Sequence, residues 1–189
     1  MSRPMRVLPT VLAGLALALP ARAQLSVDAE TFRLPNGLTV ILHRDTTTPT
    51  IATNIWYHVG SAHERPGRTG FAHLFEHIMF EGSANVPEGK IDEWFAEVGG
   101  APNGSTSRDR TNYMQSFASN ALDMALFIES DRMGHLLDAM SPASVDGQRD
   151  VVKNERRQSY DNRPYGLAGQ LITEELYAAT HPYSWPVIG

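Results

Sequence analysis

The sequence predicts an α+β fold in which helices pack on a mostly antiparallel sheet. Asn36-Gly37 lies between two apolar runs, which is a strong signal for a β-hairpin. Apolar residues farther along the chain recur at helical spacing. The resulting order of strands, two helices, a strand and further helices is typical of an α+β sandwich.

The first strands are expected within residues 30–60, as a hairpin or a three-stranded meander. A turn at residues 35–37 precedes the apolar run 38–42, and residues 51–59 are rich in β-branched and aromatic side chains. Residues 60–70 read as a polar loop. Alternation predicts one more strand at residues 111–117. Residues 101–106 are rich in turn-forming residues and therefore predict a connection.

Five segments have the apolar spacing of helices. We expect these helices at residues 70–80, 91–98, 121–140, 144–158 and 167–179. Gly82 ends the first pattern, and Gly99-Gly100 stops the second.

Composition limits the classes of protein to which the chain can belong. Its 189 residues, 42% of them hydrophobic, are enough for one domain with a core. The net charge is −5, with no basic run, so nothing indicates nucleic-acid binding. Because cysteine is absent, any metal site must use histidine and carboxylate ligands.

Residues 1–23 have the order of features of a secretory signal peptide. Arg3 and Arg6 precede an apolar run at residues 7–19, and Ala21-Arg22-Ala23 fits the rule for signal peptidase. The run is shorter than the roughly 20 residues that span a bilayer. The alternative is a buried N-terminal helix. We expect cleavage after Ala23, a periplasmic or secreted protein, and no transmembrane segment in the remaining domain of residues 24–189.

The segment His73-Leu74-Phe75-Glu76-His77 has the spacing of a zinc site on a helix. His73 and His77 are one turn apart on one face, so both imidazoles can bind the same ion. Glu76 lies on the same side and can take a proton from a water on the metal, whose pKa zinc lowers to about 7. This order of residues is that of the HxxEH metallopeptidases.

A catalytic zinc usually has three protein ligands, so a third is expected elsewhere. The other histidines read as ordinary surface or loop residues: His43, His58, His63, His135 and His181. Glu155 is the better candidate, although composition alone makes it a solvated charge beside two arginines.

Residues 70–82, GFAHLFEHIMFEG, resemble the active-site helix of the pitrilysin, insulysin and mitochondrial-processing-peptidase family. In that family the third ligand is a Glu a little under eighty residues beyond the second His, and Glu155 lies 78 residues beyond His77. The resemblance covers most of residues 30–189. It implies half of a pitrilysin-like or processing-peptidase-like domain, with one Zn²⁺ held by His73, His77 and Glu155.

The resemblance also implies a place for the substrate and one departure from the family. Residues 99–106 are similar to the family's Gly-Gly-x-x-Asn-Ala-x-Thr segment, which forms an edge strand that receives peptide. It implies substrate contacts by Asn103, Gly104, Ser105 and Thr106, whereas the residues alone equally indicate a turn. Gln148 replaces a second Glu that supports the metal site in many family members.

Family members have a second, similar domain on the same chain or on a partner, so residues 24–189 are expected to form an incomplete site. The apolar end at residues 185–188 is expected to be an uncovered core face. The sequence thus predicts a zinc endopeptidase that hydrolyses peptides or unfolded segments. The alternative is a non-catalytic structural or partner subunit, which the presence of all four motif residues disfavours.

Overall fold

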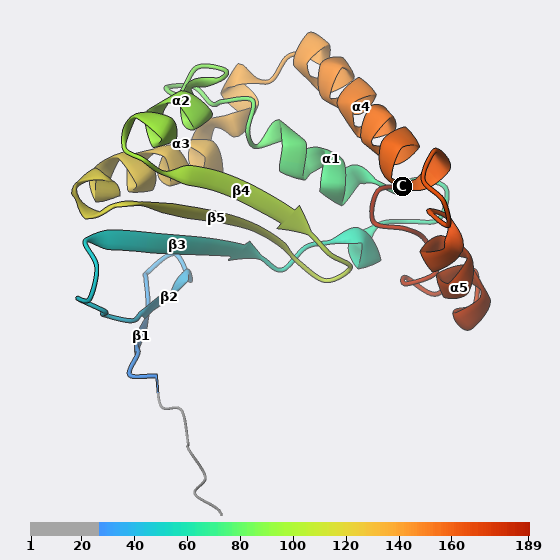
Figure 1. Ribbon diagram of the computed structural model, residues 1–189, viewed down its shortest axis with the longest axis horizontal. Coiled ribbons are helices and arrows are strands. Elements are labelled where there is room, and N and C mark those ends of the chain that lie inside the picture. The colour runs from blue at the N-terminus through green and yellow to red at the C-terminus, as the bar shows by residue number, and fades with distance from the viewer. Residues whose placement is uncertain (1–26) are drawn as a thin grey trace, which may run out of the picture. The chain divides into compact units, whose positions relative to one another are not determined.

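The computed structural model describes residues 27–189 (Figure 1). The predicted signal peptide, residues 1–23, lies outside the described residues. The chain divides into two compact units, one ending at Thr47 and the other beginning at Thr48. The two units are described separately below.

The first unit contains a two-stranded antiparallel hairpin. Strand β1 (Glu30–Arg33) pairs with β2 (Thr39–Leu42). Gly37 has φ +92°, a left-handed conformation that glycine adopts without strain. The Leu34 amide donates to the Leu38 carbonyl oxygen at 2.9 Å and closes the loop. The predicted hairpin is therefore confirmed.

The second unit contains a three-stranded antiparallel sheet in the order β3-β5-β4, formed by β3 (Thr50–Tyr57), β4 (Ala101–Thr106) and β5 (Thr111–Ala118). Strand β3 pairs with β5, so the first three strands do not form a meander. The prediction that residues 101–106 form a turn-rich connection is wrong, because these residues pair with β5 along their whole length. Pro102 is tolerated since β4 is at the edge of the sheet.

All five predicted helices are present, with ends that differ by a few residues. Their bounds are α1 (Phe71–Ile78), α2 (Lys90–Glu97), α3 (Leu122–Ala139), α4 (Pro142–Arg156) and α5 (Ala168–Leu176). A π-helical turn, Arg157–Asp161, follows α4, and α3 has a break at His135, where φ is −136°. Among residues 27–189, no helix combines the length and apolar character needed to cross a bilayer.

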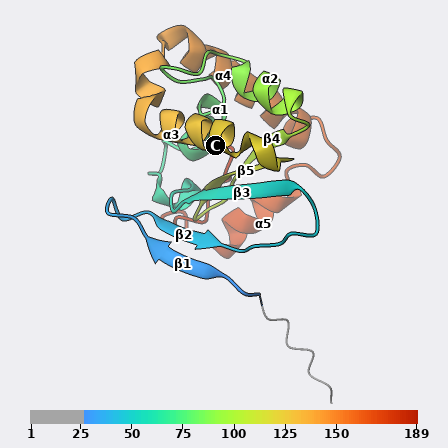
Figure 2. The same ribbon diagram turned by 90° about the vertical axis from the view of Figure 1, so that its left-hand side faces the viewer.

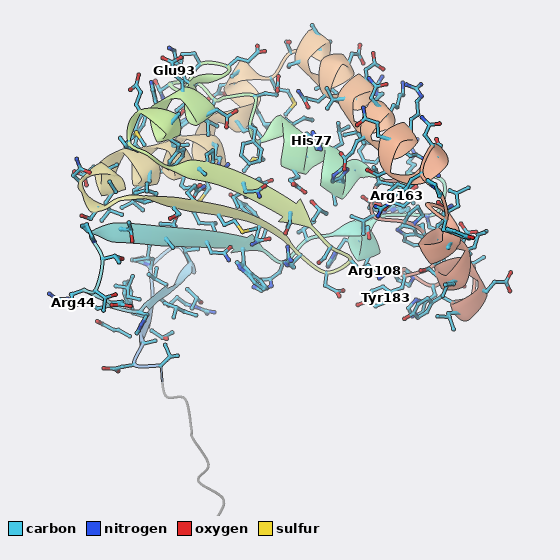
Figure 3. All side chains as sticks on the ribbon, viewed as in Figure 1. Arg44, His77, Glu93, Arg108, Arg163 and Tyr183 are labelled. Carbon is cyan, nitrogen blue, oxygen red and sulfur yellow. The ribbon has the colours of Figure 1, made fainter. Side chains whose placement is uncertain are left out.

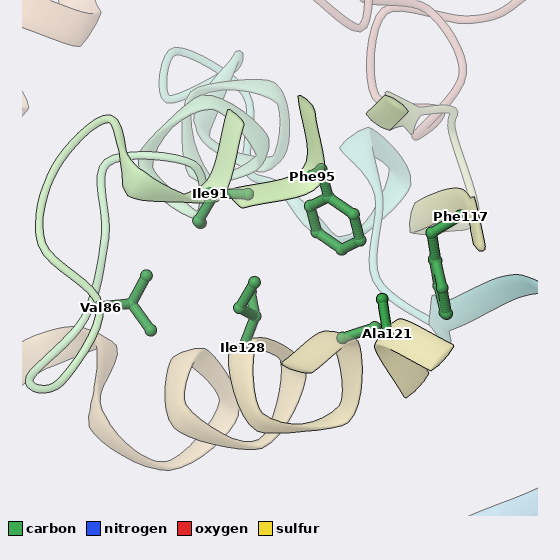
Figure 4. Close-up of a cluster of buried hydrophobic side chains, with 7 residues drawn as sticks. Val86, Ile91, Phe95, Phe117, Ala121 and Ile128 are labelled. Atoms are coloured by element: carbon green, nitrogen blue, oxygen red, sulfur yellow. The ribbon is translucent and has the colours of Figure 1, made fainter. Parts of the chain in front are cut away.

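Helices α1, α2 and α3 lie against the three-stranded sheet (Figures 1 and 2). The core between α2, α3 and β5 is apolar (Figure 4), and its buried members are Val86, Ile91, Phe95, Phe117, Ala121, Ala125 and Ile128. The Phe95 and Phe117 rings pack with centroids 5.8 Å apart. This core fixes α2 and α3 on the sheet and confirms the α+β prediction.

A buried ion pair lies beside this core. Arg132 and Glu129, one turn apart on α3, have side chains that are 0% and 3% exposed, and Arg132 Nε donates to Glu129 Oε2 at 2.9 Å. The Gln115 amide also donates to Glu129, and the Arg132 guanidinium lies 4.1 Å from the centre of the Tyr113 ring. Neither charge reaches solvent, so each would be buried at a large cost in free energy without the other.

We expect Arg132→Met to lower the free energy of unfolding by about 3–5 kcal/mol, since Glu129 would remain buried without its partner. Urea unfolding of wild type and variant measures this loss. Glu129→Gln combined with Arg132→Met is the control, because it removes both charges and should recover part of the loss. Equal losses in the single and double variants would attribute the effect to packing and not to charge.

Candidate metal centre

Helix α1 is fixed at its start by a carboxylate from the preceding loop. Glu64 accepts hydrogen bonds from the Gly70 amide at 2.9 Å and from the Ala72 amide at 2.7 Å. These amides are in the first turn, where the helix supplies no acceptor and favours negative charge. Glu64 was not among the predicted site residues, although an acid shortly before a helix start is a usable signal.

The loop before α1 also packs against the apolar segment at residues 185–188. The Trp185 indole N–H donates to the Ser61 carbonyl oxygen at 2.8 Å. Trp185 and Ile188 are only 9% and 7% exposed. The expectation of an uncovered core face at this segment is therefore wrong, because the indole finds both an apolar site and an acceptor within the unit.

Three sequence-predicted ligands come together between α1 and α4. His73 Nε2 and His77 Nε2 lie 3.6 and 3.4 Å from Glu155 Oε2. One ligand atom from each residue lies within 4.8 Å of the other two. The two imidazole rings are 4.8 Å apart and nearly perpendicular. Figure 3 shows His77 on α1, in the region between β4 and α4.

This donor set fits a zinc ion. Two atoms that each lie about 2.0–2.1 Å from a tetrahedral zinc are about 3.4 Å apart, which is close to both His–Glu separations. Burial lowers the pKa of His73, while Glu155 acts in the opposite direction. The lowered pKa favours the neutral imidazole that binds metal. The Glu155 side chain is 42% exposed, so one side of this donor set is open to solvent.

Glu155 faces the two histidines, and the two arginines that follow it bind elsewhere. Arg156 donates to the Gly189 carbonyl oxygen at 2.6 Å, and Arg157 donates to Asn154 at 2.6 Å. In the described part of the chain, neither arginine forms an ion pair with Glu155. The Glu155 carboxylate, which composition alone makes a solvated charge, therefore faces α1.

The four residues expected to contact substrate divide between the two faces of β4. The Thr106 hydroxyl donates to Glu76, and Gly104 packs against the Glu76 side chain. Asn103 is exposed and accepts a hydrogen bond from the Gly104 amide. The Ser105 hydroxyl instead donates to Asn112 at 2.7 Å. The structure thus brings Gly104 and Thr106 to the motif, but not the side chains of Asn103 and Ser105.

An apolar cleft of about 500 Å³ lies along the side of α1 that faces away from His73 and His77. Phe71 and Phe75 of α1 and Met79, directly after the helix, line one wall, and Tyr57 and Tyr113 line it from the sheet. Phe71 and Phe75 are 50% and 47% exposed. These helix positions alternate with the two histidines, so the cleft and the candidate metal centre occupy different faces of the helix.

Comparison with known proteins identifies the family. Residues 39–183 match the family described as insulinase (peptidase family M16). The chain belongs to this family. It is 35% identical over 164 residues to the zinc protease PqqE of Helicobacter pylori, an alignment that covers 85% of this chain and 36% of that protein. The resemblance of residues 70–82 to the pitrilysin and processing-peptidase family is thereby confirmed.

Solved structures share the fold of this chain. A protease from Helicobacter pylori has a TM-score of 0.78 at 34% identity, over 86% of this chain and 39% of that one. An inactive M16 domain from Pseudomonas fluorescens has a TM-score of 0.75 at 19% identity, and the match covers 86% of this chain and 39% of that one. At this identity the likeness shows the fold alone. This chain therefore spans less than two fifths of these proteins.

The departure from the family pattern at Gln148 has a local explanation in this M16 chain. Gln148 Nε2 donates to Glu81 Oε1 at 2.6 Å, two helical turns from Glu155 on α4. Burial and the nearby Glu88 raise the pKa of Glu81, while the hydrogen bond from Gln148 lowers it. A Glu at position 148 would face the Glu81 carboxylate, so the amide avoids a contact between like charges.

We expect Gln148→Glu to destabilise the fold by about 0.5–1 kcal/mol at pH 7, because two partly exposed carboxylates would meet. Each carboxyl would have a folded pKa above its unfolded value of about 4.3. The penalty should therefore be complete at neutral pH and shrink as the pH falls toward 4.5. Urea unfolding at both pH values measures it.

The control is Glu81→Gln combined with Gln148→Glu, which restores an amide–carboxylate pair with the roles reversed. This double variant should regain stability at pH 7. A Gln148→Glu penalty that does not change with pH would contradict the electrostatic explanation.

Proposed function

We propose that this chain is the zinc-binding part of a metalloendopeptidase that hydrolyses peptides or unfolded protein segments. The observation that carries the proposal is the convergence of His73, His77 and Glu155, with Glu76 close enough to act on His73. Membership of the M16 family and identity to a zinc protease support it. One Zn²⁺ would be held by the three convergent side chains.

When bound, zinc would act as a Lewis acid and lower the pKa of a coordinated water to about 7. Glu76 is the residue that would accept the proton of the attacking water, since it is on the ligand helix without being a member of the convergent set. The same carboxyl would then return the proton to the leaving amine.

A peptide substrate would bind along β4. One edge of β4 pairs with β5, and the order of the described sheet leaves its other edge without a strand partner. An extended peptide can add there through main-chain hydrogen bonds, with β4 residues 103–106 as its neighbours. A peptide bound there would have its backbone near the Glu76 carboxyl, because Gly104 and Thr106 contact that carboxyl from the same strand.

A second domain or partner subunit is part of the proposal. The chain covers 36% of the zinc protease and 39% of the crystallised protease that it matches. Donors that stabilise the developing oxyanion would come from that additional region. Each such donor typically contributes a factor of about 10²–10³ in rate, so their loss would leave little activity. We expect residues 24–189 alone to bind zinc but to cleave peptides poorly.

A non-catalytic subunit is the second candidate, since an inactive domain shares this fold. The fold cannot distinguish the two, so the decision depends on the site. His73, Glu76, His77 and Glu155 are all present and close together here, which supports the enzyme.

We expect Glu76→Gln to retain zinc and to lose about 10²–10⁴ of peptidase activity, because the near-isosteric amide cannot accept the proton. Zinc content by metal analysis and cleavage of an unstructured peptide, with the second region supplied, measure both effects. His73→Ala and Glu155→Ala are the matched controls, which should lose zinc as well as activity. Activity near wild type in Glu76→Gln would remove Glu76 as the base.

We further propose that the protein is exported to the periplasm or secreted, with a mature N-terminus at Gln24. The arginines, apolar run and small residues of residues 1–23 support this. N-terminal sequencing of protein from a periplasmic or medium fraction should return a sequence that begins Gln24-Leu25-Ser26. Intact Met1 on a cytoplasmic protein would contradict the proposal.

A further inference from the structure

The Glu76 side chain packs against strand β4. The Thr106 hydroxyl donates to Glu76 Oε2. A Cβ at Gly104 would lie 2.9 Å from Glu76 Oε1 and 3.1 Å from the Phe80 ring. The absence of a side chain at Gly104 therefore lets the strand approach the carboxyl, and Thr106, two residues farther along the same face, reaches it with a hydroxyl.

The direction of this hydrogen bond is fixed by its neighbours. The Thr106 hydroxyl donates its single proton to Glu76 Oε2. Thr111 lies opposite Thr106 in the sheet and donates to the Val59 carbonyl oxygen at 3.0 Å. The Thr111 hydroxyl is 3.5 Å from the Thr106 hydroxyl, at the limit of a hydrogen bond. Thr106 thus has one strong partner, and that partner is Glu76.

The strand alternation separates Thr106 from the other residues expected to contact peptide. Ser105 faces the opposite side, where its hydroxyl donates to Asn112 and accepts a hydrogen bond from Arg110 at 2.6 Å. Asn103 accepts from its own neighbour's amide. Of the four candidate residues, Thr106 has the hydroxyl that touches the proposed base.

We propose that Thr106 is a positioning residue: its side chain holds the Glu76 carboxylate and does not bind peptide. This inference rests on the proposed function. Anchoring Oε2 leaves Oε1 free to accept the proton of the attacking water, and a hydrogen bond to a charged acceptor is short and directional. The branched side chain of threonine has few rotamers, so the strand can hold the carboxylate with little freedom. A base fixed in orientation reacts faster than one that rotates.

The kinetic test compares Thr106→Val, which removes the hydroxyl at nearly constant shape, with Thr106→Ser, which keeps it. In the complete zinc-loaded protein, Thr106→Val should lower kcat about tenfold, less than the 10²–10⁴ that a general base contributes. KM should stay within twofold and zinc content should not change. Thr106→Ser should recover most of kcat. A raised KM with unchanged kcat in Thr106→Val would show that Thr106 binds peptide, and would overturn the proposal.

A second readout does not depend on activity. Thermal unfolding midpoints are measured for wild type, Thr106→Val, Glu76→Ala and the double variant of the complete protein. If Thr106 holds Glu76, Thr106→Val should shift the midpoint in the wild-type background by more than in the Glu76→Ala background. Additive shifts would overturn the contact whatever the activity. A wild-type protein that binds zinc but cleaves no peptide, with coupled midpoints, would contradict the proposed function alone.

Discussion

Helix α1 must contact the sheet on one side and α4 on another, and the candidate centre exists only where both contacts are made. Glu64 fixes the first turn of the helix through two amide hydrogen bonds. Toward the sheet, Gly104 and Thr106 receive the Glu76 side chain. Toward α4, His73 and His77 meet Glu155. A small rotation of α1 about its axis would disrupt both sets of contacts, because residues at this helical spacing share fixed faces.

The pairing of α1 with α4 extends beyond the three candidate ligands. Glu155 faces the two histidines, while Gln148, two turns earlier on α4, faces Glu81 beyond the end of α1. The order of these contacts shows that the two helices run antiparallel. The amide at Gln148 therefore belongs to the same interface as the ligands, although it contacts none of them, and a charge there would act on the alignment of α4.

Local signals predicted much of the fold and the motif. The turn at Asn36-Gly37 and the helical spacing within residues 70–80 each depend on neighbours in sequence, so a short window contains the necessary information. Strand β4 was different, because Pro102, Asn103 and Gly104 favour turns and form a strand only through pairing with β5. The strand was implied by family resemblance and not by its residues.

Contacts between distant segments were also beyond the reach of sequence patterns. The hydrogen bond from Thr106 to Glu76 joins residues 30 positions apart, and the burial of Trp185 against Ser61 joins residues 124 apart. Each depends on how elements pack after they form. The exposed Phe71 and Phe75 show the converse, since their apolar spacing predicted the helix but not that a cleft would lie beside them.

The separation of the candidate ligands along the chain has a thermodynamic consequence. Because Glu155 follows His77 by 78 residues, an ion held by both would close a loop that includes α2, all of β4 and β5, and α3. Such a closure removes conformational entropy from the unfolded chain only if the ion stays bound there; an ion that binds solely to the folded chain stabilises by mass action. An ion that binds only the folded chain would connect distant parts of the unit across this loop, and its affinity would then set how much it raises the free energy of unfolding.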